Sequence, residues 1–271
     1  MAKFEVLIPS ADGTKSTVVT AEGQDWFVGL ETALSGRGLA DCMKNIICDV
    51  KEDGGIYVTD TASGRRFFLR EIDDSQPQTD IRKVVKLEKI APVAADVSKN
   101  DRIADLFFEV SGAQGKPMQE GIDFFLDLAL KYVPCESGSF ARSDLSTTDM
   151  EFVSCRGPKA DSVVGIKVRV GQGFVGFSAK HNCFIAVGDV HKDPRFYKTI
   201  SQNIGYETSS IVCAPIKSSE TNITFGVLEL INRKGSSRIN AEDMEILRII
   251  GDQMAEYFHA IWTGTNNTFE E

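Results

Sequence analysis

The chain has 271 residues and a formal net charge of −9 at pH 7, with 42% hydrophobic and 25% charged residues. A chain of this length has room for about two domains of ordinary size. The acidic balance disfavours nucleic acid or an anionic membrane as the main partner, because both attract a basic surface. No apolar run approaches the roughly 20 residues that span a bilayer, and residues 1–13 lack the apolar core of a signal peptide. We therefore expect a cytoplasmic protein without a nucleic-acid or membrane partner.

The first 90 residues are predicted to form a small α+β domain with the order ββαβββ. Short alternating segments flank turn-forming residues, which is typical of hairpins, and one segment has the three- and four-residue apolar spacing of a helix. The expected strands are 4–8, 16–20, 45–50, 56–59 and 65–70, and the expected helix is 24–34. No catalytic constellation stands out in residues 1–90, so the role of this domain stays open.

A linker and a connector helix are predicted for residues 91–117, whose first part is a loose run of proline, alanine, aspartate and serine. Residues 118–262 form the second expected domain, and residues 263–271 are predicted to be a disordered tail. The last helix of that domain begins after Asn240, with Asp243 in the position of a capping box. Its broad apolar face must be buried, against its own sheet or against a second copy of the chain.

The most informative stretch is 165–196, where a strand, a glycine turn, a short apolar helix and a second strand lead into an Asp-Pro loop. This order places the free amides of a helix N-terminus beside a sheet edge and under a polar loop, and such a place suits a small ligand. The three histidines are too few and too scattered for a metal site. The sequence therefore predicts a small-molecule site without a metal.

Five sequence blocks of the second domain resemble those of GAF domains, which are small-molecule sensory modules. The blocks are PCESGS at 134–139, GQGFVG at 171–176, IAVGDVHKDPRF at 185–196, GYETSSIVCAPI at 205–216 and GVLELIN at 226–232. The resemblance covers residues 118–262, and we interpret the chain as a bacterial GAF-domain protein. It implies an α+β fold, a six-stranded antiparallel sheet with helices on both sides, and a ligand cavity between the sheet and residues 189–205. The N-terminal domain resembles no family.

Candidate ligand-binding residues follow from this resemblance. In GAF domains that bind cyclic nucleotides, the ligand rests near the pocket helix and contacts a strand serine, a threonine after the Gly-Tyr pair and a strand glutamate. No catalytic residue, metal ligand or cofactor is expected, apart from a small-molecule or cyclic-nucleotide ligand. The residues expected to bind that ligand are Ser139, Phe174, Val175, Ala186, Asp189, Phe196, Tyr197, Ser201, Thr208 and Glu229.

Several residues depart from the cyclic-nucleotide pattern or have a structural alternative. Ser201 and Ile204 stand where those GAF domains carry an aspartate and a threonine for base and phosphate contacts. The N-K…F…D-E signature of mammalian phosphodiesterase GAF domains is changed to N-R…I…D-M, at residues 232–244. The structural alternatives are hydrogen bonds within the sheet for Thr208 and Glu229, turn caps for Asp189 and Asp193, core packing for Phe196 and Tyr197, and an ion pair for Arg195.

The function that we expect is that of a non-enzymatic signal-transduction sensor or adaptor. Its GAF domain would bind a small molecule and relay this through the helices of a homodimer to an unknown downstream signalling protein. Two alternatives stay open, a cyclic-nucleotide-binding regulator and a ligand-free dimerisation or interaction scaffold. A third, a methionine sulfoxide reductase of the GAF type, needs an accessible thiolate, for which Cys183 is the candidate.

Overall fold

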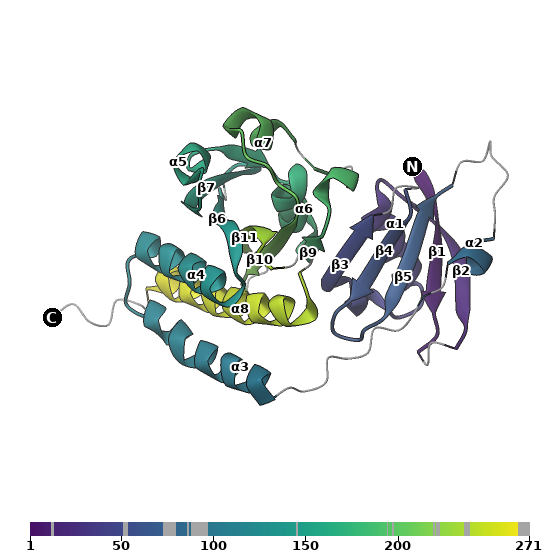
Figure 1. Cartoon of the computed structure of the whole chain (residues 1–271), viewed down its shortest axis with the longest axis horizontal. Helices are drawn as coiled ribbons and strands as arrows, with labels where there is room; N and C mark the ends of the chain where they lie inside the picture. Colours follow the sequence, from purple (N-terminus) through teal and green to yellow (C-terminus); the bar gives the residue numbers. More distant parts are fainter. Residues whose placement is uncertain are drawn as a thin grey trace. The chain divides into compact units, whose positions relative to one another are not determined.

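The chain divides into two compact units, residues 1–94 and 95–271, and each is described here by itself (Figure 1). The structure is a computed structural model. It describes residues 1–11, 14–50, 54–72, 80–85, 87, 97–144, 146–193, 195–196, 198–218, 220, 223–235 and 239–264. Within these residues, every helix is too short or too polar to span a bilayer.

The first unit is one antiparallel sheet with a helix on it, and its element order contains the predicted ββαβββ. The sheet order is β2-β1-β5-β4-β3. Asp25 caps the helix by accepting a hydrogen bond from the Val28 amide (3.0 Å). The elements are β1 (Ala2–Pro9), β2 (Ser16–Gly23), α1 (Trp26–Ser35), η1 (Ala40–Met43), β3 (Asn45–Val50), β4 (Ile56–Asp60), β5 (Arg66–Glu71) and α2 (Ile81–Val84).

The second unit has its own set of antiparallel strands, in the order β9-β10-β11-β6-β7-β8. The described residues hold eleven strands in all, so six strands describe this unit and not the chain. Its elements are α3 (Val97–Val110), η2 (Ser111–Ala113), α4 (Met118–Tyr132), β6 (Cys135–Ser143), β7 (Asp149–Arg156), α5 (Ala160–Val163), β8 (Lys167–Arg169), α6 (Gly173–His181), β9 (Phe184–Val187), η3 (Val190–Lys192), α7 (Lys198–Ile204), β10 (Ile211–Lys217), β11 (Thr224–Arg233) and α8 (Ala241–Thr263).

Helices cover both faces of this second sheet. The long helices α4 and α8 lie side by side on one face, and α6 and α7 lie on the other (Figure 1). Helix α8 begins as predicted, because the Asn240 side chain accepts from the Asp243 amide (2.9 Å) and the Asp243 side chain accepts from the Asn240 amide (3.1 Å). The Asp243 carboxylate also pairs with Arg233 of β11 (3.0 Å), which joins the start of α8 to the end of a central strand.

Helices α4 and α8 approach each other closely at Gly121. The Tyr257 hydroxyl of α8 donates to the backbone carbonyls of Lys116 and Pro117, at 2.9 and 3.0 Å. A methyl group on Gly121 would lie 2.1 Å from that hydroxyl oxygen. Glycine is therefore required at this crossing because any side chain would push the two helices apart.

The Gly121→Ala variant tests this packing. Alanine favours a helix by about 1 kcal/mol over glycine, but overpacking of this kind costs about 1–3 kcal/mol, so we expect a net loss of stability. Gly251→Ala in α8 is the matched control, because its new methyl would lie 3.4 Å from the Ile216 side chain, an ordinary contact. In calorimetric unfolding, Gly121→Ala should be less stable than the parent, and Gly251→Ala should be at least as stable as the parent. Equal stability of the two variants would contradict the close approach.

Candidate functional site

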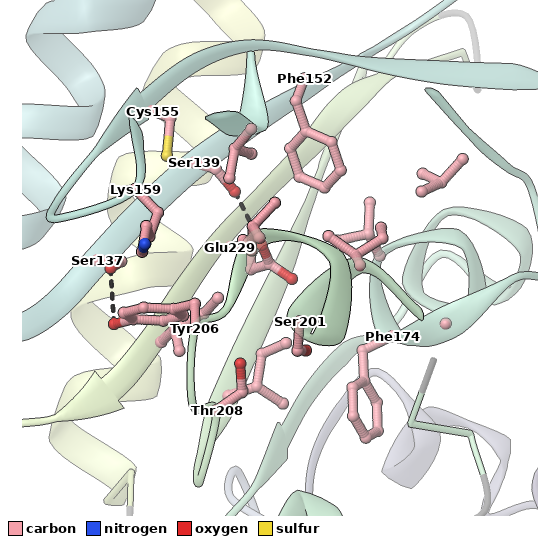
Figure 2. Close-up of a pocket in the computed structure, with 18 of the residues that line it drawn as sticks. Ser137, Ser139, Phe152, Cys155, Lys159, Phe174, Ser201, Tyr206, Thr208 and Glu229 are labelled. Carbon is pink, nitrogen blue, oxygen red and sulfur yellow. Dashed lines mark hydrogen bonds between the residues drawn. The ribbon is translucent and has the colours of Figure 1, made fainter. Parts of the chain in front are cut away.

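A cavity of about 90 Å3 lies inside the second unit, between its sheet and the helices α5, α6 and α7 (Figure 2). Strands β6, β7 and β11 form its floor, and the segment 196–208 covers it. This is the place that the sequence predicts, since part of the segment 189–205 closes over the sheet. The region also includes the glycine turn and the start of α6, at Gln172 and Gly173.

The pairing register of four neighbouring strands determines which side chains lie together at the floor of the cavity. Ser139 of β6 pairs directly with Cys155 of β7 on one side and with Glu229 of β11 on the other, and Glu229 in turn pairs with Cys213 of β10. Directly paired residues of antiparallel strands point to the same face. One row of thiol, hydroxyl, carboxyl and thiol groups therefore crosses the sheet on the side of the cavity.

Glu229 is the one acidic residue among the described residues of the cavity lining, and it is only 8% exposed. Its Oε2 accepts a hydrogen bond from the Ser139 hydroxyl (2.8 Å), and no cation pairs with it in the described part of the chain. Burial raises the pKa of Glu229 to about 7, and the bond from Ser139 opposes this only in part. Figure 2 shows the other carboxylate oxygen directed away from Ser139, among the side chains that line the cavity.

Two hydroxyl groups line the cavity beside Glu229. Thr208 precedes β10 and is 4% exposed, and Ser201 belongs to α7. Neither hydroxyl makes a hydrogen bond with another described residue, whereas Ser139 and Ser137 both do. The cavity thus holds two hydroxyls and a carboxylate oxygen that are open to a ligand.

Aromatic and aliphatic side chains form the rest of the wall. Phe174 of α6 and Phe196 of the covering segment stack with their ring centroids 6.3 Å apart. Phe152 of β7 lines the cavity as well, and Tyr206 lies at its other end, beside Ser137 (Figure 2). Apolar walls with a few convergent polar groups are typical of small-molecule sites.

A buried ion pair holds the covering segment on α6. Asp193, which is 3% exposed, accepts from the backbone amide of Arg195 (2.9 Å) and pairs with its guanidinium group. The same guanidinium lies over the rings of Phe177 (4.6 Å) and Phe174 (5.3 Å) of α6. The ion pair that the sequence analysis gives as the structural role of Arg195 is present.

The segment that carries Thr208 is held by Asn232 at the end of β11. The Asn232 side-chain oxygen accepts from the amides of Ser209 (2.8 Å) and Ser210 (3.3 Å), and its amide group donates to Glu136 and to the Glu207 carbonyl, both at 2.8 Å. Asn232 has a φ of 58°, a left-handed conformation that asparagine tolerates better than most residues.

The structure brings seven of the ten predicted ligand residues to the cavity, two lie elsewhere, and one falls outside the described residues. Ala186 is buried in β9, outside the lining. Asp189 caps η3 through the His191 amide (3.2 Å) and pairs with Lys192 (3.3 Å), which is the expected structural role. Tyr197 falls outside the described residues. The seven lining residues are Ser139, Phe174, Val175, Phe196, Ser201, Thr208 and Glu229.

Sequence reasoning missed several lining residues. Ser137 lies two positions before Ser139 on the same strand, so the two-residue period of a strand was a usable signal for it. Cys155 and Phe152 of β7 required the strand register, which the sequence does not show. Lys159 directly precedes the short helix α5 and Val163 ends it, and this helix is too short to show a helical period.

Glu229→Gln tests the burial of the carboxyl group. The folded pKa of about 7 exceeds the ordinary value of 4.5, so Glu229 contributes stability at low pH that is lost as the pH rises through 7. The loss amounts to about 3 kcal/mol. Calorimetry should show Glu229→Gln with the parent's stability near pH 5 and with greater stability at pH 8. The exposed control variant Glu256→Gln should have the same stability as the parent at both pH values. If Glu229→Gln also matches the parent at both pH values, the result contradicts a buried, ionisable Glu229.

Asn232 variants test the hold on the Thr208 segment. Asn232→Gly removes the side-chain hydrogen bonds and keeps the left-handed backbone, while Asn232→Ala also strains it by about 1–2 kcal/mol. Loss of the acceptor should cost about 1–3 kcal/mol in both. We expect faster amide exchange at Ser209 and Ser210 in both variants and lower stability for alanine than for glycine. Unchanged exchange in Asn232→Gly would show that Asn232 does not order this segment.

Comparisons with known proteins cover only part of the chain. No family model matches it. The dual 3',5'-cyclic-AMP and -GMP phosphodiesterase 11A of Takifugu rubripes is 35% identical over 80 residues, which are 30% of this chain and 9% of that protein. The cGMP-specific 3',5'-cyclic phosphodiesterase of Drosophila melanogaster is 34% identical over 100 residues, which are 34% of this chain and 9% of that protein. The matches thus span a small part of these relatives.

Solved structures resemble the chain over about the length of its second unit. The GAF domain from Acinetobacter phosphoenolpyruvate-protein phosphotransferase has a TM-score of 0.51 and 15% identity, and covers 63% of this chain and 99% of that one. The GAF domain of the Coxiella burnetii phosphoenolpyruvate-protein phosphotransferase has a TM-score of 0.52 and 16% identity, and the match covers 62% of this chain and 96% of that one. The free methionine-R-sulfoxide reductase of Neisseria meningitidis has a TM-score of 0.51 and 15% identity, with 63% and 96% covered. The chain therefore contains the α+β fold of GAF domains, which the five sequence blocks predict.

Proposed function

We propose that this chain is a non-enzymatic sensor whose GAF-fold unit binds a small molecule in the cavity over Glu229. One observation carries the proposal: the Thr208 and Ser201 hydroxyls and one Glu229 oxygen line an apolar cavity without a hydrogen-bond partner among the described residues. Polar groups that line an apolar cavity without a protein partner carry a desolvation cost. A ligand or ordered water that binds all three removes that cost.

The size of the cavity favours a small ligand. Sites for drug-sized molecules have volumes of about 300–1,000 Å3, and this cavity has about 90 Å3. A larger ligand requires α7 and the segment before it to move outward. Such a movement would connect occupancy of the cavity to the position of a surface segment, which is what a sensor needs.

Helices on the opposite face are suited to relay the signal through a homodimer. Connector helix α3 is tied to its neighbours by the ion pairs Arg102–Glu242 (2.6 Å) and Lys131–Glu109 (2.6 Å). Its Phe107 and Phe108 are nonetheless 55% and 80% exposed. Exposed aromatic residues on a helix that is already docked favour a second copy as partner, and we propose that a downstream signalling protein reads the geometry of that pair.

The thiols of the unit support a role without catalysis. Burial raises the pKa of Cys155 to about 11, and Cys213 and Cys183 are almost fully buried. A reductase nucleophile needs a lowered pKa and exposure to solvent. In the part of the chain described, no group of three or more His, Cys, Asp or Glu side chains is placed to hold a metal ion.

A cyclic nucleotide is the second candidate ligand. The similarity to cyclic-nucleotide phosphodiesterases supports it, and so does the placement of Ser139, Thr208 and Glu229 on the cavity, as in the family pattern. Ile204 also lines the cavity, and it offers no hydroxyl where those domains carry one. The remaining alternative, a ligand-free scaffold, is disfavoured because the stacked rings of Phe174 and Phe196 leave the cavity open.

Thermal shift with cyclic AMP, cyclic GMP and a panel of metabolites tests the proposal. A ligand at 100 times its Kd stabilises the folded protein by about 2.7 kcal/mol. We expect at least one compound to raise the melting temperature and Thr208→Ala to reduce that shift, because the variant lacks the free hydroxyl. Thr20→Ala, on the exposed side of β2 in the first unit, is the control and should keep the full shift. No shift with any compound would favour the scaffold.

A further inference from the structure

The geometry of the cavity points to the class of its ligand: we propose a small organic cation, such as a protonated amine, that directs its N–H groups at Glu229. This inference rests on the proposed ligand-binding function and goes beyond it by assigning a charge to the ligand. The starting observation is that the Glu229 carboxyl group at the floor of the cavity accepts a hydrogen bond from a hydroxyl group and pairs with no cation among the described residues. A charge buried in this way is normally paired.

Among the residues that the structure describes, no charged group of the surrounding elements pairs with Glu229. The neighbouring titratable groups in the sheet are the Cys155 and Cys213 thiols, and burial together with the charge of Glu229 raises the pKa of both, so they stay neutral. Arg195, on the covering segment, is engaged with Asp193. The described lining residues of α6 and α7 carry no charge: they are Gly173, Phe174, Val175, Ile200, Ser201 and Ile204.

Lys159 is the one basic residue among the described residues of the lining, and it lies at one end of the cavity. Its side chain is exposed, and Figure 2 places its amino group beside Ser137, at the end of the cavity near Tyr206. The pKa of Glu229 is shifted by burial and by Ser139, with no contribution from Lys159. The positive charge missing at the floor is therefore not supplied by this lysine.

The walls suit a cation as well. Phe152 and Phe174 flank the space in front of Glu229, and Tyr206 closes one end (Figure 2). Aromatic faces attract a cation by about 0.5–2 kcal/mol, most strongly where water is excluded. The free hydroxyls of Ser201 and Thr208 accept further N–H groups. An anion would instead face a carboxylate in a medium of low polarity, which is unfavourable.

The protonation of Glu229 gives the inference a pH signature. Below pH 7 the carboxyl group is mostly neutral and attracts a cation weakly, and above pH 7 it is mostly ionised. Affinity for a cation should therefore rise by about tenfold from pH 6 to pH 8, following the ionised fraction. A neutral ligand of the same shape should show little change, and an anion should bind more weakly as the pH rises.

The test uses the full chain and three phenyl probes of similar size: benzylammonium, benzyl alcohol and benzoate. Binding is measured by calorimetric titration at pH 6, 7 and 8, a range in which the first stays a cation and the last an anion. We expect benzylammonium to bind at least tenfold more tightly than benzyl alcohol at pH 8, and benzoate least tightly. Glu229→Gln should reduce the preference for the cation to about twofold or less and remove its pH dependence, while benzyl alcohol binding persists. The control variant Glu256→Gln should bind all three probes with the same affinities as the parent.

The outcomes separate this inference from the function on which it rests. If benzyl alcohol or a cyclic nucleotide binds in the cavity and benzylammonium has no advantage at pH 8, the ligand is not a cation but the sensor function stands. If no probe, cyclic nucleotide or metabolite binds at any pH, both fail. The pH profile of the parent protein alone decides the charge preference, should Glu229→Gln not fold.

Discussion

Glu229 is held at the floor of the cavity by a single hydrogen bond from Ser139 (2.8 Å), and the rest of the site depends on that arrangement. Strand register alone brings the two residues face to face. The same register leaves only thiols beside them, so the carboxyl group is desolvated without a cation. A fold that retains such a group inside its core is less stable at neutral pH than one without it, and we propose that a bound ligand offsets this loss.

Two adjacent residues connect the wall of the cavity to the start of helix α8 on the far face of the sheet. Asn232 holds the segment of Thr208, and Arg233 pairs with Asp243 at the start of α8. Both belong to the end of β11, the strand that carries Glu229. We propose that a shift of the segment over the cavity reaches the N-terminus of the long helix through these neighbouring backbone groups. This physical connection fits a relay towards the exposed face of α3.

Much of the second unit was predictable from sequence because its signals are local. The alternating strands, the glycine turn before α6 and the Asn240–Asp243 cap of α8 each depend on neighbouring residues. The free hydroxyls of Ser201 and Thr208 were found through the family pattern, and Asp189 was misplaced because a turn cap and a ligand contact need the same residue type.

What could not be predicted depends on contacts between distant residues. Cys155 reaches the cavity only through its pairing with Ser139, and Gly121 is constrained only by Tyr257, far along the chain. Connector helix α3 begins at Val97, within the first part of residues 91–117 that the sequence predicts to be a loose linker, because this turn has no apolar stripe in the sequence. The raised pKa of Glu229 could not be predicted either, because it results from the burial of the carboxyl group in the folded structure.

Xenon binding to a crystal tests most directly whether the sheet and its covering helices leave room for a guest molecule. Xenon enters preformed apolar cavities without needing a matched hydrogen bond. An open cavity predicts a xenon peak between Phe152 and Phe174, within reach of Thr208, in crystals under pressure. Continuous side-chain density across that space, with no xenon site, would contradict a preformed ligand cavity in this protein.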